Sequence, residues 1–124
     1  MATVLQTPLT ALADKLVTVD TVSNTPNNSI TDETTGTVYL LEVDNTNSSA
    51  VGAYLKIADA SSATIGTTQP KLSLYIPPNT KQTFAFQNGH TYTAGLSIWA
   101  TRNPEYTDNT KPNAALVVKV LVTA

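Results

Sequence analysis

The feature that most constrains the fold of this chain is the alternation of apolar and polar residues within its short hydrophobic runs. Between positions 116 and 122, near the C-terminus, every even-numbered residue is Leu or Val. Side chains of a β-strand point alternately to its two faces, so this period of two predicts strands that are buried on one face. Clusters of Pro, Asn, Asp and Ser separate the runs, and these residues are typical of turns.

Seven segments show strand character by this reasoning. They are residues 15–19, 37–44, 51–58, 72–76, 82–86, 92–101 and 115–122. Helical spacing occurs only over residues 10–16, which predicts at most one helical turn. Seven to eight short strands at this spacing favour an all-β fold, an antiparallel β-sandwich or jelly roll. With 124 residues, the chain has the length of one domain, here residues 14–124 preceded by an extended N-terminal arm of residues 1–13.

The apolar positions of these strands predict the core. Its expected members are Leu40, Val43, Leu55, Ile57, Leu72, Leu74, Ile76, Phe84, Phe86, Leu96, Ile98, Val118 and Val120. Residues 38–41 form a continuous apolar run, which predicts that this strand is covered on both faces.

Two apolar features have no place in that core, and they indicate a contact surface. One is the arm, and the other is the second face of the last strand. The residues concerned are Val4, Leu5, Leu9, Leu12, Val117 and Leu121. Either a partner covers them, or the arm folds back over the last strand of its own domain.

Aromatic residues add to the candidate contact surface. Trp99 alternates outward from its strand, and Tyr75 faces away from the apolar side of its own. An exposed aromatic side chain can anchor a protein interface or serve as a platform for a sugar ring, with Tyr54, Tyr75 and Tyr92 beside Trp99.

The charge and hydropathy of the sequence limit the classes of partner that we expect. Charged residues make up 13% of the chain, about half the usual share, and the net charge is -2 with seven scattered basic residues. Nucleic-acid binding requires a basic patch, so no nucleic-acid partner is expected. The N-terminus has no basic region and Pro8 interrupts its apolar stretch, so we expect neither a signal peptide nor a membrane span.

The residues that carry most enzyme chemistry are scarce. Cysteine is absent and His90 is the only histidine, in an Asn-Gly-His-Thr sequence that predicts a solvated turn. The Asp-Asn-Thr-Asn run at 44–47 lacks the glycine and the distal glutamate of a calcium loop, and predicts an Asx turn. We therefore expect no enzyme activity, and no catalytic, cofactor-binding or metal-ligating residues.

The chain from residue 37 onward contains a characteristic series of strand and turn segments. They are Tyr-Leu-Lys-Ile-Ala at 54–58, Ile-Gly-Thr-Thr-Gln-Pro at 65–70, Tyr-Ile-Pro-Pro-Asn-Thr at 75–80, Phe-Ala-Phe at 84–86 and Tyr-Thr-Ala-Gly-Leu-Ser-Ile at 92–98. This series resembles small β-sandwich proteins of tailed bacteriophage virions. The resemblance implies a homo-oligomeric virion protein, made in the bacterial host cytoplasm, of the capsid decoration or cement type. Its partner would be the major capsid protein. The alternative is a tail- or fibre-associated module that binds carbohydrate or other tail proteins.

Overall fold

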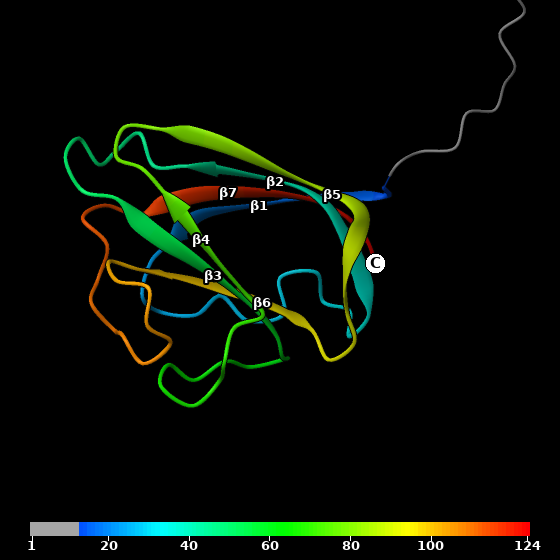
Figure 1. The fold of residues 1–124 in the computed structure, drawn as a ribbon. Coiled ribbons are helices and arrows are strands. Elements are labelled where there is room, and N and C mark those ends of the chain that lie inside the picture. Colours follow the sequence, from blue (N-terminus) through cyan, green and yellow to red (C-terminus); the bar gives the residue numbers. More distant parts are fainter. Residues whose placement is uncertain (1–12) are drawn as a thin grey trace, which may run out of the picture.

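The computed structural model describes residues 13–124 and shows an all-β sandwich, as the alternation predicts. Its strands are β1 (Lys15–Val22), β2 (Gly36–Asp44), β3 (Ala53–Asp59), β4 (Leu72–Ile76), β5 (Lys81–Tyr92), β6 (Leu96–Thr101) and β7 (Leu116–Thr123). One sheet has the order β1-β7-β2-β5 and the other β4-β3-β6, with every pair antiparallel. The four-stranded sheet is the upper layer in Figure 1 and the three-stranded sheet the lower layer.

The main core lies between the two sheets. The even-numbered residues of β7 all face it and are fully buried, which confirms the predicted orientation of that strand. The core also takes buried residues from the other strands, among them Val43, Leu55, Ile57, Ile76, Leu96 and Ile98. Leu72, Leu74, Phe84 and Phe86 are only partly buried and pack against its rim.

The sequence predicts that the continuous apolar run of β2 is covered on both faces, but the structure shows a bulge within this run. The pairing of β2 with both neighbours shifts between Val38 and Leu40, so Tyr39 is an extra residue at a bulge. Val38 and Leu41 therefore both point into the core, although three positions separate them. The prediction that Leu40 is a core residue is wrong: it pairs with Leu121 on the outer face of the sheet.

Strand β5 is more than twice as long as the sequence indicates, because it continues through the expected turn at Asn88-Gly89. Ala85 pairs with Leu40 and His90 with Val38, so residues 86–89 form an irregularity in the ladder. Gly89 has a positive φ of 79°, which a glycine adopts without steric cost. In Figure 1, β5 starts in the upper layer and curves down towards the lower one.

The expected long strand over residues 92–101 is in fact divided by a tight turn. Thr93 and Ala94 leave the ladder, Gly95 has a φ of 135°, and β6 begins at Leu96. The expected helical turn over residues 10–16 is wrong at its described end, because Lys15 and Leu16 already belong to β1. Residues 10–12 of that turn, like most of the predicted arm, lie outside the described residues.

Candidate functional site

A row of apolar side chains crosses the outer face of the four-stranded sheet. Leu16 of β1 pairs with Leu121 of β7, Leu121 pairs with Leu40 of β2, and Leu40 pairs with Ala85 of β5. Leu16 is 65% exposed, the largest exposed fraction among the large hydrophobic residues described. We call these four residues the leucine row. The outer face of an antiparallel sheet normally carries polar side chains, so an apolar row there indicates a contact surface.

The rows on either side of the leucine row are polar. On one side are Thr37, Thr91 and Thr123, which are cross-strand neighbours. On the other side Glu42 lies opposite Lys119, so a negative and a positive side chain face each other across the strands. The leucine row is therefore flanked by threonine hydroxyls on one side and by a facing pair of opposite charges on the other.

The chain enters the domain beside the leucine row. Asp14 immediately precedes β1, and its carboxylate accepts a hydrogen bond of 3.2 Å from the backbone N–H of Ala124. Residues 35–37, 91–93 and 123–124 border an open hollow of about 460 Å³ at this end of the sheet. Val4, Leu5, Leu9 and Leu12 of the predicted contact surface lie outside the described residues.

The other residues predicted to form the contact surface do not share one face. Val117 and Leu121 point outward from β7 and are half-buried, as the alternation predicts. Tyr75 is 49% exposed on the outer face of the three-stranded sheet, where its ring lies 5.1 Å from that of Tyr54. One flat contact can include Leu121 or Tyr75, but not both.

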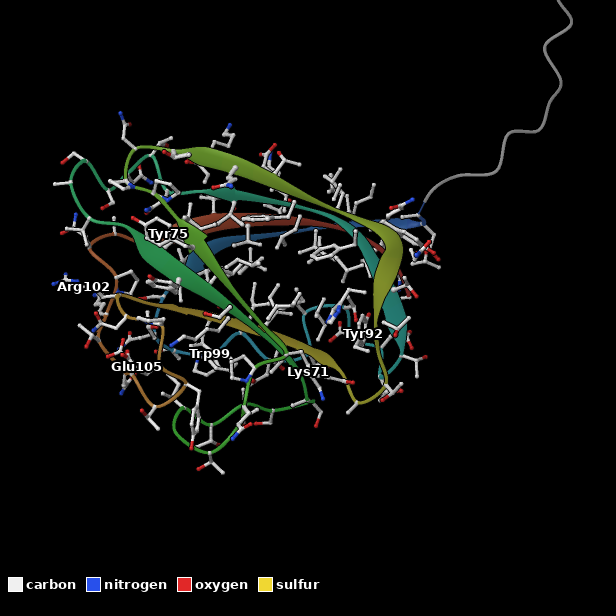
Figure 2. All side chains as sticks on the ribbon, in the orientation of Figure 1. Lys71, Tyr75, Tyr92, Trp99, Arg102 and Glu105 are labelled. Carbon is white, nitrogen blue, oxygen red and sulfur yellow. The ribbon has the colours of Figure 1, made fainter. Side chains whose placement is uncertain are left out.

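The expectation that Trp99 lies on the surface is wrong, because the indole is completely buried. Trp99 does point away from the main core, as the alternation predicts, but loops cover it. It packs with Ala58 and Ala63, and with Ala60 and Ile65 at the edge of this second cluster. Figure 2 shows Trp99 on the lower side of the molecule, where the loops lie. Every residue of β6 is buried for this reason.

Lys56 is a buried charged residue on the outer side of the three-stranded sheet. It pairs with Trp99 across β3 and β6, has no exposed surface, and its ammonium group donates a hydrogen bond to the backbone carbonyl of Glu105. Burial lowers the pKa of Lys56, while the nearby carboxylates of Asp108 and Glu105 raise it in part. The contact joins the three-stranded sheet to the loop of residues 102–112.

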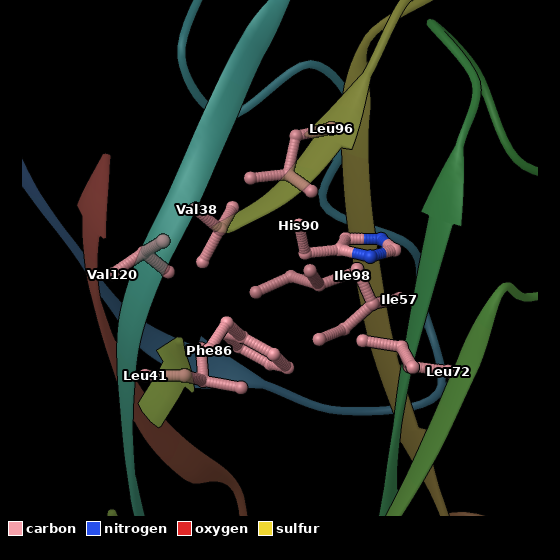
Figure 3. A pocket seen from close by; sticks show the side chains of 9 residues that line it. All are labelled: Val38, Leu41, Ile57, Leu72, Phe86, His90, Leu96, Ile98 and Val120. Atoms are coloured by element: carbon pink, nitrogen blue, oxygen red, sulfur yellow. The ribbon is translucent and has the colours of Figure 1, made fainter. Parts of the chain in front are cut away.

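His90 is not the solvated turn residue that the sequence predicts. It lies in β5 and is partly buried, with its ring 5.9 Å from that of Phe86. Both side chains border a small cavity between the sheets, which Figure 3 shows with Ile57, Leu72 and other apolar residues around it. The cavity volume is about 10 Å³, no more than one water molecule needs, so it is a packing gap and holds no ligand.

The carboxylates with lowered pKa values organise turns. Hydrogen bonds from the side chain and the backbone of Thr46 hold the pKa of Asp44 below its ordinary value, which confirms the Asx turn predicted at 44–47. Asp108 accepts bonds from Asn103 and Thr110 in the same way within its own loop. Within residues 13–124, no three side chains of the metal-binding types gather at one place.

The same part of the chain contains no helix long and apolar enough to cross a membrane. Comparisons of the sequence with protein families, with curated proteins and with solved structures gave no match.

Proposed function

We propose that this chain is a structural virion protein of a tailed bacteriophage, a decoration or cement protein that binds the outer surface of the major capsid protein shell and stabilises it. The observation that supports the proposal is the leucine row, an apolar surface that the domain itself leaves open around Leu16. A shell presents the same surface many times. A modest contact repeated over such a lattice can therefore strengthen the whole particle.

The chemistry of the face fits a contact between proteins. Burying threonine hydroxyls and a balanced pair such as Glu42 and Lys119 costs less than burying unpaired charges. Asp14 lies at the same end of the sheet, so an arm formed by residues 1–13 can extend the contact onto a neighbouring capsid subunit. This role involves no catalytic step, cofactor, nucleic acid or membrane.

Binding to capsid shells of the phage that encodes the chain tests the proposal. We expect Leu121→Gln to weaken binding about tenfold or more, because it places an amide in an apolar contact. Tyr75→Gln is the matched control, since Tyr75 also points outward but lies on the opposite sheet. Deleting residues 1–13 should also weaken binding. If Leu121→Gln binds like the wild type, the leucine row is not the capsid contact.

The alternative, a carbohydrate-binding tail or fibre module, now depends on Tyr75. Trp99 and Tyr92 are buried, but the exposed ring of Tyr75 rests against Gly52, where an added Cβ would lie 2.5 Å from the tyrosine hydroxyl. A ring held in this way loses little freedom when a sugar stacks on it. Binding of the wild type to a glycan array, lost in Tyr75→Ala and retained in Leu121→Gln, would favour this module over the decoration protein.

A further inference from the structure

The two sheets of the domain have four edge strands, and the structure protects three of them. Unpaired backbone groups along an edge strand can pair with another chain, so folded proteins usually cover, shorten or distort such edges. Beside β6, residues 23–30 supply partners: Ala100 donates to the carbonyl of Ser23, Ile30 donates to that of Leu96, and Asn27 pairs with Ile98. That edge is fully occupied.

The edges at β4 and β5 are protected by sequence and shape. β4 has only five residues and lies between Pro70 and Pro77-Pro78, which lack the N–H donors that a new partner strand would need. β5 carries the irregularity of residues 86–89 and curves between the layers, so a straight partner strand cannot follow it.

Strand β1 has none of these protections along residues 15–19. It pairs with β7 on one side, and no other described segment pairs with its second side. These five residues contain no proline and no glycine, and their ladder with β7 is regular up to Val19. Leu16, in the leucine row, stands on this open edge.

We propose that the β1 edge pairs with the β1 edge of a second copy of the chain, antiparallel about a two-fold axis, with Leu16 opposite Leu16 of the second copy. In this register Lys15 faces Val17, and Asp14 faces Thr18. The two sheets then form one sheet of eight strands, and the two leucine rows join into a single row across it.

Charge and strand geometry select this register over its neighbours. Residues that face each other must lie on the same side of the sheet, so the register can move only in steps that keep even positions opposite even positions. Moving the axis to Val17 places Asp14 opposite Asp20, where two carboxylates repel each other. Moving it to Thr18 places Leu16 opposite Asp20, and this separates the two leucine rows.

The pairing needs no partner other than a second copy of the chain, so it is independent of the proposed capsid role and can be tested in solution. The natural chain has no cysteine, which allows a single cysteine to report on the axis. Facing residues of antiparallel strands have Cα atoms about 4.5–5.5 Å apart, within the range of a disulfide. Leu16→Cys should therefore form a disulfide-linked dimer under mild oxidation.

Thr18→Cys is the matched control on the same strand and the same face. In the proposed register the two Thr18 residues are offset by four positions along the strand, roughly 13 Å, which is too far for a disulfide. The Thr18→Cys variant should stay monomeric on a non-reducing gel. Efficient crosslinking of Thr18→Cys with none for Leu16→Cys would overturn the register.

Sedimentation of the unmodified chain tests the dimer itself. We expect a dimeric wild type, and self-association weakened at least about tenfold in Leu16→Asp, because two carboxylates then meet at the axis. Thr83→Asp, on the same outer face but in β5, should remain dimeric. A monomeric wild type overturns the proposal. If deleting residues 1–13 from a monomeric wild type produces the dimer, the chain's own arm is what occupies the edge.

Discussion

Single residues hold the turns of this domain together, and Asp59 is the clearest case. Its carboxylate accepts backbone hydrogen bonds from Thr93 at 2.9 Å and from Ala94 at 2.8 Å, in the turn that separates β5 from β6. Partial burial alone would raise the pKa of Asp59, but these bonds outweigh it and hold the pKa below its ordinary value of 3.8.

We expect Asp59→Asn to lower the free energy of unfolding by about 1 kcal/mol at neutral pH, since hydrogen bonds to a charged acceptor are lost at a partly solvated site. The pKa is lower in the folded state, so the contribution of the carboxylate is complete above 3.8 and disappears as the pH falls through the folded value. The difference between variant and wild type should therefore shrink in acid.

Urea unfolding near neutral pH and again in acid measures this change. Asp20→Asn is the control, because Asp20 is an exposed carboxylate of β1 whose side chain makes no hydrogen bond with any residue from 13 to 124. A difference between Asp59→Asn and wild type that stays constant down to the most acid pH would show that the charge of Asp59 is not what stabilises the turn.

Lys56 gives a second prediction at the scale of one residue. Its methylene chain is fully buried on the outer side of the three-stranded sheet, and its ammonium group donates a hydrogen bond to a carbonyl in an exposed loop. Lys56→Met keeps most of the volume and removes a buried charge, so the free energy of unfolding should change by less than about 1 kcal/mol.

Lys56→Ala should instead cost about 2–4 kcal/mol, because it leaves a cavity beside Trp99. Chemical denaturation of both variants separates packing from charge. An equally large loss in Lys56→Met would mean that the ammonium group itself holds the loop of residues 102–112.

Lys56 and Trp99 also show what alternation can and cannot predict for a residue. The pattern correctly places both on the side of their strands away from the main core. It contains no information about what covers that side, because the cover consists of loops distant in sequence, such as the one that brings Glu105 to Lys56. Burial on such a face is a tertiary effect.

At the scale of elements, regular strands are predictable from the sequence and irregular ones are not. The segment 72–76 coincides with β4, because its alternation is unbroken and prolines mark its end. The bulge at Tyr39 and the irregularity after Ala85 both break the period of two. For this reason the pattern wrongly places Leu40 in the core and ends β5 before Asn88.

The irregularity of β5 depends on Gly89, and this can be tested. A Cβ at Gly89 would lie 2.2 Å from Cγ2 of Thr37, and the positive φ disfavours any other residue. We expect Gly89→Ala to lower the free energy of unfolding by about 2–3 kcal/mol, from strain and overpacking together.

Gly66 provides a matched control for this substitution. It also has a positive φ, 90°, but a Cβ added there would meet nothing within 4 Å. Gly66→Ala should therefore show the cost of backbone strain alone, about 1 kcal/mol, in the same thermal or urea unfolding experiment. Equal losses in the two variants would mean that Thr37 moves aside without cost.

At the scale of the whole molecule, the strand order is what alternation leaves undetermined. The final strand β7 lies between β1 and β2, so the first and last strands of the domain are neighbours in one sheet. Each strand of that sheet has one apolar face, and any order would bury it. Hydrogen bonds such as that between Ala124 and Asp14 select among the orders, and they depend on geometry that the pattern does not contain.

If β1 pairs with β1 of a second copy, the free energy of unfolding of the protein depends on its concentration. Dissociation is then coupled to unfolding, and each tenfold rise in protein concentration adds about 1.4 kcal/mol per dimer, or half of that per chain. For a domain of this size the midpoint of thermal unfolding should rise by roughly 2–4 °C for each tenfold step. In Leu16→Asp the midpoint should change less with concentration than in the wild type. Calorimetry over a hundredfold concentration range measures how the unfolding midpoint of each protein changes with concentration. A wild-type midpoint that stays constant would mean that the leucine rows of two copies do not join before the protein meets another partner.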